Sequence, residues 1–428
     1  MRYIDLFAGA GGLSEGFIKA GYSPVAHVEV DRAACYTLTT RLAYHYLKSI
    51  KRQDVYESYL RGHITRPQLY ASVPDDVLKS VINARIDDDM MPLIFRAVDS
   101  LAQGQEIDVI VGGPPCQAYS VVGRARDADS MRGDERNYLY RYYGRFLKRY
   151  EPKAFVFENV LGLLTAEGGK YFKNMKAYFR RIGYEVDHTI LKACEFGVLQ
   201  NRQRVLIIGW HKDLGHSGLP DFHRIEGQYR VDDLLNDLPH IQAGEGTIKG
   251  GAYTRKSTKY LEQTMIRNGL DVLTLHCARP HVSRDLEIYR IVVERWNKTR
   301  ERLRYSDLPK SLQTHNNTTS FLDRFKVVAA DNPYSHTVVA HIHRDGHHYV
   351  HPDLNQNRSI SVREAARLQS FPDDFYFEGI RETNPRTAAF KQIGNAVPPL
   401  LACSIAEAIK PMLSSTDTEP CRPNMAPA

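Results

Sequence analysis

The sequence predicts an α/β fold in which a parallel sheet is covered by helices on both faces. Two observations carry this prediction. Over the first 210 residues, short apolar segments alternate with longer amphipathic segments, and this regular order is lost beyond them. Strands that alternate with helices are typical of a parallel sheet. The candidate strands are Tyr3–Phe7, Pro24–Val30, Val109–Val111, Ala154–Glu158, Glu185–Leu191 and Arg204–Trp210, and the candidate helices include Leu13–Ala20, Tyr138–Tyr150 and Lys170–Ile182.

The composition is that of a globular protein with room for two cores. The chain has 428 residues, of which 43% are hydrophobic and 25% charged. Its formal charge of +7 is compatible with a polyanionic partner. The six cysteines include no CxxC pair, which is typical of reduced thiols in a cytosolic protein. We recognise neither a signal peptide nor an apolar stretch of the roughly 20 residues that span a bilayer, and we expect a soluble, cytoplasmic protein.

The alternation of strands and helices is interrupted twice. Residues 45–93 are charged and helix-like, and we interpret them as an insertion into a first domain, 1–211. Residues 212–354 form a second, smaller and less regular domain. The helical pattern of the first domain returns over 355–413, and the tail 414–428, rich in Ser, Thr and Pro, is expected to be disordered. Within the second domain we expect a loop at Gly244–Gly251, a helix near Asp285–Leu303 and an extended segment at His336–His343.

A cysteine follows a rigid turn at the end of a predicted strand. Val109–Val111 runs into two glycines, Pro114 and Pro115, and Cys116 comes next. Glycine permits unusual backbone angles, whereas proline fixes its own φ and restricts the residue before it. The carboxyl end of a strand is a sensible mount for a nucleophilic thiolate. A buried structural cysteine on an ordinary turn is the alternative, and this segment alone leaves both open.

A glycine turn joins the first predicted strand to the first helix. In Phe7-Ala8-Gly9-Ala10-Gly11-Gly12-Leu13-Ser14, backbone can approach a ligand closely and the helix N-terminus favours a negative group. The segment is not a GxGxxG fingerprint, because Ser14 replaces the last glycine. Glu29 ends the second strand about 20 residues on, where an acid can bind ribose hydroxyls; an exposed strand-end carboxylate is the alternative. Together they favour a cofactor that contains adenosine.

Two further motifs lie at strand ends. Glu158 ends an apolar strand, where a partly desolvated carboxyl group could donate a hydrogen bond or a proton to a heterocycle. A residue near a helix N-cap is its structural alternative. Arg202 and Arg204 precede the last strand, and we expect their guanidiniums on one face beside the site, clamping a phosphate or carboxylate. A solvated surface pair is equally consistent with the arginines alone.

These segments, taken in order, resemble the motifs of the DNA cytosine-5 methyltransferases. The resemblance covers both ends of the chain and leaves mainly 45–93, the second domain and the tail unmatched. The matching segments are Asp5–Gly12, Gly113–Gln117, Glu158–Val160, Gln200–Arg204, Arg358–Pro372 and Gln392–Pro399.

The resemblance implies a Rossmann-like sheet that binds S-adenosylmethionine, and a set of functional residues. Cys116 would attack carbon 6 of an extruded cytosine, Glu158 would hold its ring nitrogen 3 and amine, and carbon 5 would take the methyl group. Beta-elimination would then release the cysteine. The implied catalytic residues are Cys116, Glu158, Arg202 and Arg204; the implied cofactor residues are Phe7, Gly9, Gly11, Glu29, Asp99, Pro115 and Asn395; and the implied substrate residues are Gln117, Ser120, Asn159 and Thr337.

The second domain occupies the position of the family's target recognition domain. Thr337-Val338 resembles the pair that anchors the recognition loops, and Asn316, Asn317 and Arg324 are candidates for reading base edges. Thirteen of the seventeen histidines fall between residues 211 and 351, and His341 and His343 would share a strand face. Their spacing matches no structural zinc site, so we expect neutral hydrogen-bonding or DNA-contacting histidines and no metal.

Other functions are less consistent with these motifs. A transfer-RNA methyltransferase of the same fold has other residues after the Pro-Cys pair and a smaller recognition region. A catalytically silent DNA-binding module would not need Cys116, Glu158 and Arg202 together. Ser14 counts against a nucleotide-dependent oxidoreductase, and an amino-methyltransferase would carry an Asx-Pro-Pro-aromatic motif. We therefore expect a monomeric, prokaryotic enzyme that methylates double-stranded DNA and is paired with a restriction endonuclease.

Overall fold

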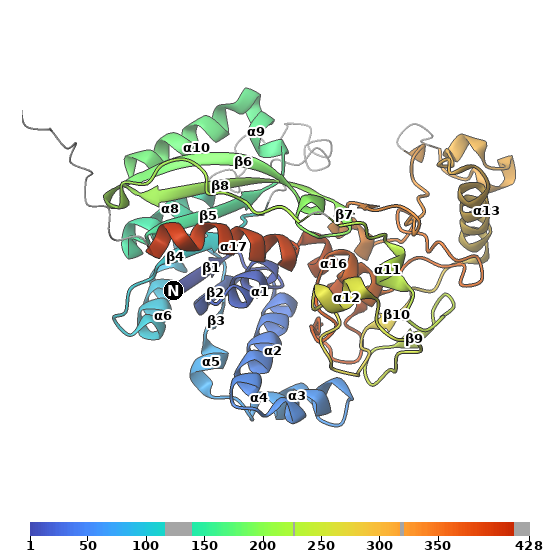
Figure 1. Ribbon diagram of the computed structural model, residues 1–428, viewed down its shortest axis with the longest axis horizontal. Coiled ribbons are helices and arrows are strands. Elements are labelled where there is room, and N and C mark those ends of the chain that lie inside the picture. Colours follow the sequence, from blue (N-terminus) through green and yellow to red (C-terminus); the bar gives the residue numbers. More distant parts are fainter. Residues whose placement is uncertain (116–138, 226, 317–320, 415–428) are drawn as a thin grey trace, which may run out of the picture.

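The computed structural model describes residues 1–115, 139–225, 227–316 and 321–414. At its centre is a seven-stranded sheet in the order β3-β2-β1-β4-β5-β8-β6 (Figure 1). The six strands predicted from the sequence are present, and an α/β fold is confirmed. The strands of the sheet are β1 (Arg2–Leu6), β2 (Ser23–Glu29), β3 (Val81–Asn83), β4 (Val109–Gly112), β5 (Ala154–Asn159), β6 (Tyr184–Lys192) and β8 (Gln203–His211).

The sheet is mixed rather than wholly parallel, which corrects the prediction. The strands from β3 to β5 are parallel to one another, whereas β8 is antiparallel to both of its neighbours, β5 and β6. The reason lies in the connection between β6 and β8, residues 193–202. A connection this short can join antiparallel neighbours, but a parallel crossover needs a dozen or more residues.

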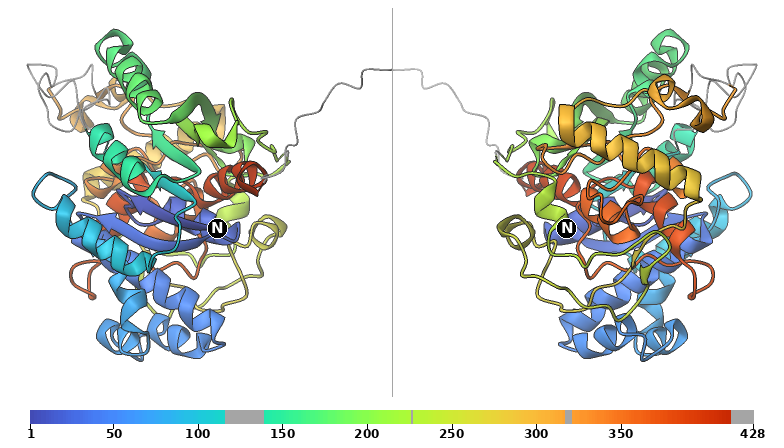
Figure 2. Two further views of the ribbon diagram at one scale, coloured as in Figure 1. Left: turned by 90° about the vertical axis from the view of Figure 1, so that its left-hand side faces the viewer. Right: turned by 90° about the vertical axis from the view of Figure 1, so that its right-hand side faces the viewer.

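Helices cover both faces of the sheet, as expected. Successive side chains of each strand point to opposite faces, so Ile110 packs against one layer of helices while Val109 and Val111 pack against the other. Figures 1 and 2 show the two layers. One layer contains α6 (Met91–Ala102), α8 (Leu139–Tyr150), α9 (Gly162–Thr165) and α10 (Lys170–Arg181), and the other contains α1 (Gly12–Lys19) and α17 (Pro399–Ser414).

The contact between α1 and α17 is close enough to exclude side chains. A Cβ atom on Gly16 would lie 2.4 Å from the Cβ of Ala402. The hydroxyl of Tyr22 donates to the carbonyl of Ala406 at 3.0 Å, and the Lys410 ammonium donates to the carbonyl of Ala20 at 2.7 Å. Residues from both ends of the sequence therefore build one layer over the sheet.

The segment 45–93 is only partly an insertion. Its last part contains β3, which pairs in parallel with β2 at the edge of the sheet, and the start of α6. The strand was not predicted because it has three residues and no room for a periodic pattern. The remainder forms the end of α2 (Arg32–Ser49) and three short helices, α3 (Gln53–Leu60), α4 (Arg66–Tyr70) and α5 (Asp75–Lys79).

Residues 212–354 contain shorter and less regular elements than residues 1–211. A helix near 285–303 is confirmed as α13, and together with residues 303–312, 321 and 325 it forms a small core of its own at one end of the molecule (Figures 1 and 2). By contrast, α11 and α12 share a core with α15 and α16. The elements of the expected second domain are the helices α11 (Asp232–Leu235), α12 (Lys259–Gln263) and α13 (Ser283–Thr299) and the short strands β9 (Gly246–Thr247), β10 (His276–Cys277) and β11 (Ser335–His336). The helices α15 (Val362–Leu368) and α16 (Arg386–Asn395) follow it in the sequence, and the short strand β7 (Gln200–Asn201) precedes it.

The alternating segment 336–343 is not an extended strand. Only β11 pairs, with β7, and the chain then turns into a 3₁₀ helix, η8 (Ala340–His343). His341 and His343 therefore do not share a strand face, which corrects the prediction. A period of two needs a partner strand to stabilise it, and β7 offers only two residues.

One apolar segment is longer than we expected from the sequence, in which we recognised no stretch of membrane-spanning length. Residues 386–413 are long and apolar enough by composition to cross a membrane, but 67% of the apolar window is buried inside the molecule. The segment consists of α16 and α17, which break at residues 396–398 and pack against the other elements. We interpret it as a pair of core helices.

Candidate active site

The predicted motifs lie at one edge of the sheet. The parallel strands β1, β2, β4 and β5 all end there, and ligands bind at this edge in such folds. The structure thereby brings together the glycine turn 7–12, Glu29, Pro115 and Glu158. Cys116, Gln117, Ser120 and Asn317 lie outside the described residues, and the turn that leads to the cysteine is described up to Pro115.

The glycine turn is held by Glu29. The carboxylate of Glu29 accepts hydrogen bonds from the backbone N–H of Gly9 at 2.8 Å and of Asp31 at 2.7 Å. Gly9 and Gly11 have φ of 56° and 84°, in the left-handed region that favours glycine. Phe7 also has a positive φ, 58°, a strained conformation for a residue with a side chain. The turn is therefore fixed by its own backbone, with a carboxylate at its centre.

A second carboxyl group at this turn was missed by the sequence reading. Asp5 is fully buried in β1, and among the described residues neither of its carboxyl oxygens has a hydrogen-bond partner. Burial raises the pKa of Asp5 well above its usual value, and the negative charge of Glu29 raises it further. A buried polar group without a partner is rare, which makes Asp5 a candidate ligand for a bound polar group. The feature of the sequence that could have indicated this role is an acidic residue inside an otherwise apolar strand.

Glu158 and Arg204 form the ion pair at the end of β5. The Nε atom of Arg204 lies 2.6 Å from Oε1 of Glu158, and both side chains are largely buried, with 14% and 12% of their surface exposed. The other carboxyl oxygen of Glu158 lies against the turn that precedes Cys116, because a Cβ atom on Gly113 would be 2.7 Å from Oε2. Gly113 therefore leaves the space that this carboxylate occupies.

Asn159 holds the turn before the cysteine. Its side-chain amide donates to the carbonyl of Pro114 at 3.2 Å, and its own Oδ1 accepts from the backbone N–H of Val160 at 2.9 Å. Asn159 is buried, so both contacts are shielded from water. The peptide two residues before Cys116 is thereby fixed to the end of the neighbouring strand.

Arg202 does not lie beside Arg204, which corrects the expectation of a clamp on one face. Arg202 is completely buried, and its guanidinium donates to the backbone carbonyls of Val338, Gly394 and Ala396. Unlike Arg204, it makes no contact with Glu158 in the described residues. Arg202 directly precedes β8 and Arg204 lies at its start, as the sequence predicted, but the sequence could not show which way each side chain points.

The structure does not bring Asp99, a predicted cofactor residue, to this edge of the sheet. It lies near the end of α6, which leads to the start of β4 and therefore to the opposite edge of the sheet. There it forms a close ion pair with Arg149, whose hydrogen bond lowers the pKa of the carboxyl group, and accepts from the Tyr150 hydroxyl at 3.0 Å.

Asn83, at the end of the strand that the sequence reading missed, lies at the correct edge. Its side-chain amide donates to the carbonyls of Glu29 at 3.0 Å and Val30 at 3.1 Å. Asn395 ends α16 with its side chain exposed. Thr337 follows β11, and its hydroxyl donates to the carbonyl of Asn201 in β7 at 2.6 Å.

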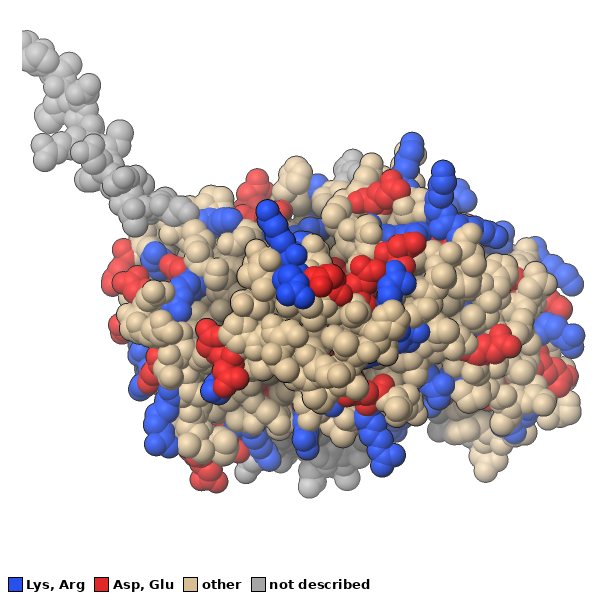
Figure 3. All heavy atoms as spheres, turned by 90° about the horizontal axis from the view of Figure 1, so that it is seen from below, with Lys and Arg blue, Asp and Glu red and all other residues tan. Residues whose placement is uncertain are grey.

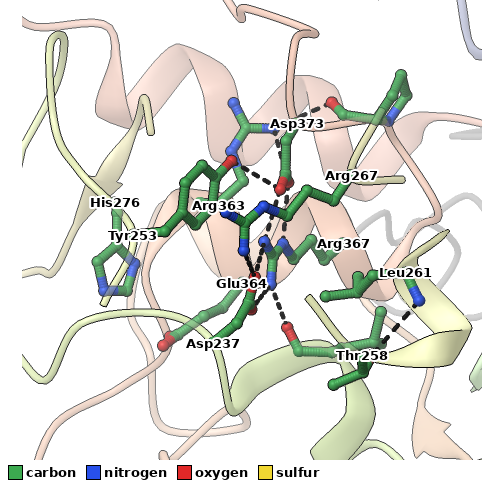
Figure 4. A network of polar contacts seen from close by, with 12 residues as sticks. Asp237, Tyr253, Thr258, Leu261, Arg267, His276, Arg363, Glu364, Arg367 and Asp373 are labelled. Carbon is green, nitrogen blue, oxygen red and sulfur yellow. Dashed lines mark hydrogen bonds and ion pairs between the residues drawn. The ribbon is translucent and has the colours of Figure 1, made fainter. Parts of the chain in front are cut away.

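A network of buried charges connects α15 to the segments around it (Figure 4). Arg367 forms ion pairs with Asp237 at 2.5 Å and Asp373 at 2.6 Å, and all three side chains are buried. Arg267 reaches the same Asp237 at 3.0 Å. Burial alone would raise the pKa of Asp373, but the attraction of Arg367 outweighs it and the pKa is lowered. The network fixes 237 and 267, within the expected second domain, to the returning segment 355–413.

Several histidines of the region 211–351 are buried and hydrogen-bonded, and His336 is an example. His336 stacks on Tyr349 with ring centroids 5.1 Å apart, and its Nε2 donates to the carbonyl of His348 at 2.5 Å. Burial lowers the pKa of His336 to about 4. Charge is also mixed on the surface: Figure 3 shows lysines and arginines interspersed with acids over the face that it draws.

Known proteins and one family profile match this chain over nearly its whole length. The sequence profile of the C-5 cytosine-specific DNA methylases matches residues 1–64 and 95–411, leaving a gap that contains α4, α5 and β3. The chain is 41% identical to the type II methyltransferase M.Bpa9945I of Bacillus paralicheniformis, covering 97% of this chain and 99% of that protein. It is 34% identical to M.DdeI of Desulfomicrobium norvegicum, covering 96% and 88%.

The fold also resembles solved structures. A prophage-encoded DNA modification methyltransferase candidate from E. coli superposes with a TM-score of 0.60 at 22% identity, over 96% of this chain and 99% of that one. The methyltransferase EhMeth of Entamoeba histolytica superposes with a TM-score of 0.53 at 14% identity, over 96% and 98%. At these identities the likeness concerns the fold alone.

Proposed function

Because the chain belongs to the family of C-5 cytosine-specific DNA methylases, we propose that it methylates carbon 5 of a cytosine within a specific sequence of double-stranded DNA. The observation that carries this proposal is the arrangement at the ends of β4 and β5. The Glu158 carboxylate, paired with Arg204, lies against Gly113, three residues before Cys116. A nucleophile and a hydrogen-bonding acid are thus mounted on adjacent strands.

The reaction follows from these two groups. The Cys116 thiolate adds to carbon 6 of the cytosine. Glu158 transfers a proton to ring nitrogen 3 and accepts a hydrogen bond from the exocyclic amine, so that the ring stays neutral as the S–C6 bond forms. The S–C6 bond makes carbon 5 nucleophilic, so that it takes a methyl group. The proton on carbon 5 then passes to water, the S–C6 bond breaks to release the thiolate, and ring nitrogen 3 returns its proton to Glu158, which restores the aromatic ring. Arg204 keeps Glu158 oriented through this sequence.

The methyl group would come from S-adenosylmethionine, which supplies an electrophilic methyl on a positively charged sulfur. The residues present fit this cofactor. Asp5 offers a buried carboxyl group that has no hydrogen-bond partner among the described residues, and Glu29 has oxygen lone pairs left after binding two backbone amides. The turn at Gly9 and Gly11 lets backbone approach the ligand, and we assign Phe7, Pro115 and Asn395 to the same pocket.

The DNA substrate requires base extrusion, because carbon 6 of a stacked cytosine is out of reach of a side chain. We assign Gln117, Ser120, Asn159 and Thr337 to the binding of the extruded base and its strand. Relatives named type II methyltransferases favour a restriction-modification context in which methylation protects cellular DNA from a partner endonuclease. We propose that the protein acts in the cytoplasm as a monomer.

The proposal is tested by mapping methylation in cells that express the chain. Bisulfite sequencing of genomic DNA should show methylated cytosine in one sequence context, and the matched variant Cys116→Ser should show none. Transfer RNA from the same cells serves as the second substrate. Methylated cytosine in the RNA with none in the DNA would overturn the DNA assignment, and full DNA methylation by Cys116→Ser would overturn the mechanism.

A further inference from the structure

Arg202 joins two backbone segments that are far apart in the sequence, at Val338 and at 394–396. Its Nη1 donates to the carbonyl of Val338 at 2.7 Å, and its Nη2 donates to the carbonyls of Gly394 at 3.2 Å and Ala396 at 2.8 Å. Val338 follows Thr337, which we assign to the DNA side. Gly394 and Ala396 flank Asn395, which we assign to the cofactor side. One guanidinium thus holds both segments.

The same two segments are in direct backbone contact. A Cβ atom on Gly394 would lie 2.3 Å from the backbone nitrogen of Ala340 and from the carbonyl carbon of Val339, so no side chain fits between them. Accordingly, α16 packs against η8 along this line. A displacement of the segment 338–340 must therefore move the end of α16, because buried backbone at contact distance cannot be compressed.

Two buried glutamines complete the junction. The Oε1 atom of Gln200 accepts from the backbone N–H of Val338 at 3.0 Å, and the Nε2 atom of Gln369 donates to the carbonyl of Ile393 at 2.6 Å. The two side chains are bonded to each other, from Nε2 of Gln200 to Oε1 of Gln369 at 3.1 Å. Arg202 is the member of this group that reaches both segments by itself.

We propose that Arg202 is a positioning residue that couples cofactor binding at Asn395 to DNA binding at Thr337, and that it does not contact the cytosine. The inference rests on the proposed function. A cofactor that orders the end of α16 orders Val338 through the shared guanidinium, and DNA bound at Thr337 acts in the reverse direction. Because such coupling is reciprocal, it can be measured from either ligand.

The test compares the affinity for S-adenosylhomocysteine with and without DNA. The probe is a short duplex that carries the sequence found by methylation mapping, and the Kd is measured by calorimetry. For the wild type we expect the duplex to lower the Kd at least about fivefold, the lower end of typical couplings. The variant Arg202→Lys keeps the charge but lacks the planar fork that reaches three carbonyls, and its ratio should fall towards one.

Arg363→Lys is the matched control. Arg363 is equally buried and donates to backbone carbonyls, those of Thr274, Pro372 and Phe375, but it does not touch the junction. It should lose stability and keep the wild-type ratio. Gly394→Ala perturbs the junction from the other side and should lower the ratio as Arg202→Lys does, which decides the matter if that variant does not fold.

A wild-type ratio of one with DNA bound, or an unchanged ratio in a folded variant of the junction, would overturn the inference while leaving the proposed function intact. Failure of the wild type to methylate or bind any DNA would instead remove the proposed function.

Discussion

Adding one methyl group at Gly113 should displace Glu158 and slow the reaction without weakening the binding of S-adenosylmethionine. In Gly113→Ala the new Cβ atom would lie 2.7 Å from Oε2 of Glu158, whereas ordinary contact begins at 3.4 Å. The carboxylate must therefore move by about 0.7 Å to relieve the overlap. The Arg204 guanidinium, 2.6 Å from Oε1, restrains it on the other side.

The expected loss can be scaled from that displacement. A misplacement of about 1 Å of a catalytic group costs up to about 100-fold in rate, so we expect kcat to fall about 10- to 100-fold. The KM for S-adenosylmethionine should stay within about twofold, since the glycine turn at Gly9 is a separate structure. Transfer of a labelled methyl group to a duplex containing the mapped sequence measures both constants.

A double-variant cycle provides the control. Glu158→Gln removes the carboxylate, so adding Gly113→Ala to it should cost little further activity if the methyl group acts through Glu158. Losses that simply multiply in the double variant, or a Gly113→Ala enzyme with wild-type kcat, would refute this reasoning. A second control is thermal unfolding, which must show that the variants are folded at the assay temperature.

Three further outcomes follow from groups described above. Arg367→Met removes the cation that the buried carboxylates of Asp237 and Asp373 share, leaving Arg267 on Asp237, and should destabilise the protein by about 3–5 kcal/mol in urea unfolding, whereas the exposed Lys79→Met should leave the urea midpoint nearly unchanged. Asp99→Asn should leave the Kd for S-adenosylhomocysteine within about twofold, whereas Asn83→Ala, which frees the carbonyls of Glu29 and Val30, should raise it about fivefold; the reverse order would restore Asp99 to the pocket. Burial lowers the pKa of five histidines to about 4, so the folded state takes up their protons later than the unfolded chain does as the pH falls, and the free energy of unfolding should decrease from about pH 6.5 to pH 4. His336→Gln should make that decrease shallower, and urea titrations that show no pH dependence over this window would contradict the assignment. The five histidines whose pKa is lowered to about 4 are His27, His276, His281, His336 and His348.

The sheet could be predicted where its strands are buried on both faces. Val109–Val111 and Phe155–Phe157 are continuous apolar runs, which is the pattern that a strand between two helical layers requires. The edge strand β3 has no such pattern, and its neighbour β2 alone decides that Val81–Asn83 is extended. The direction of β8 depends on the length of a connection, which alternation of strands and helices does not reveal.

The residues of the candidate site could likewise be predicted only in part. Residues at strand ends, such as Glu29 and Glu158, could be placed because the topology brings strand ends together. Asp99 was misplaced because its position depended on β3, and the two arginines of 202–204 were not separated because a sequence does not show side-chain direction. Asp5 was overlooked because its significance lies in the lack of a partner, which only packing reveals.

The layer built from α1 and α17 has a consequence for synthesis of the protein. The glycine turn leads directly into α1, and α1 reaches its final packing only when α17 covers it. On the ribosome, the proposed nucleophile, its acid and the first glycine turn all emerge hundreds of residues before that helix, while the surface of α1 is still bare. We therefore expect a nascent chain to carry the proposed reactive groups long before α17 can complete the packing of α1.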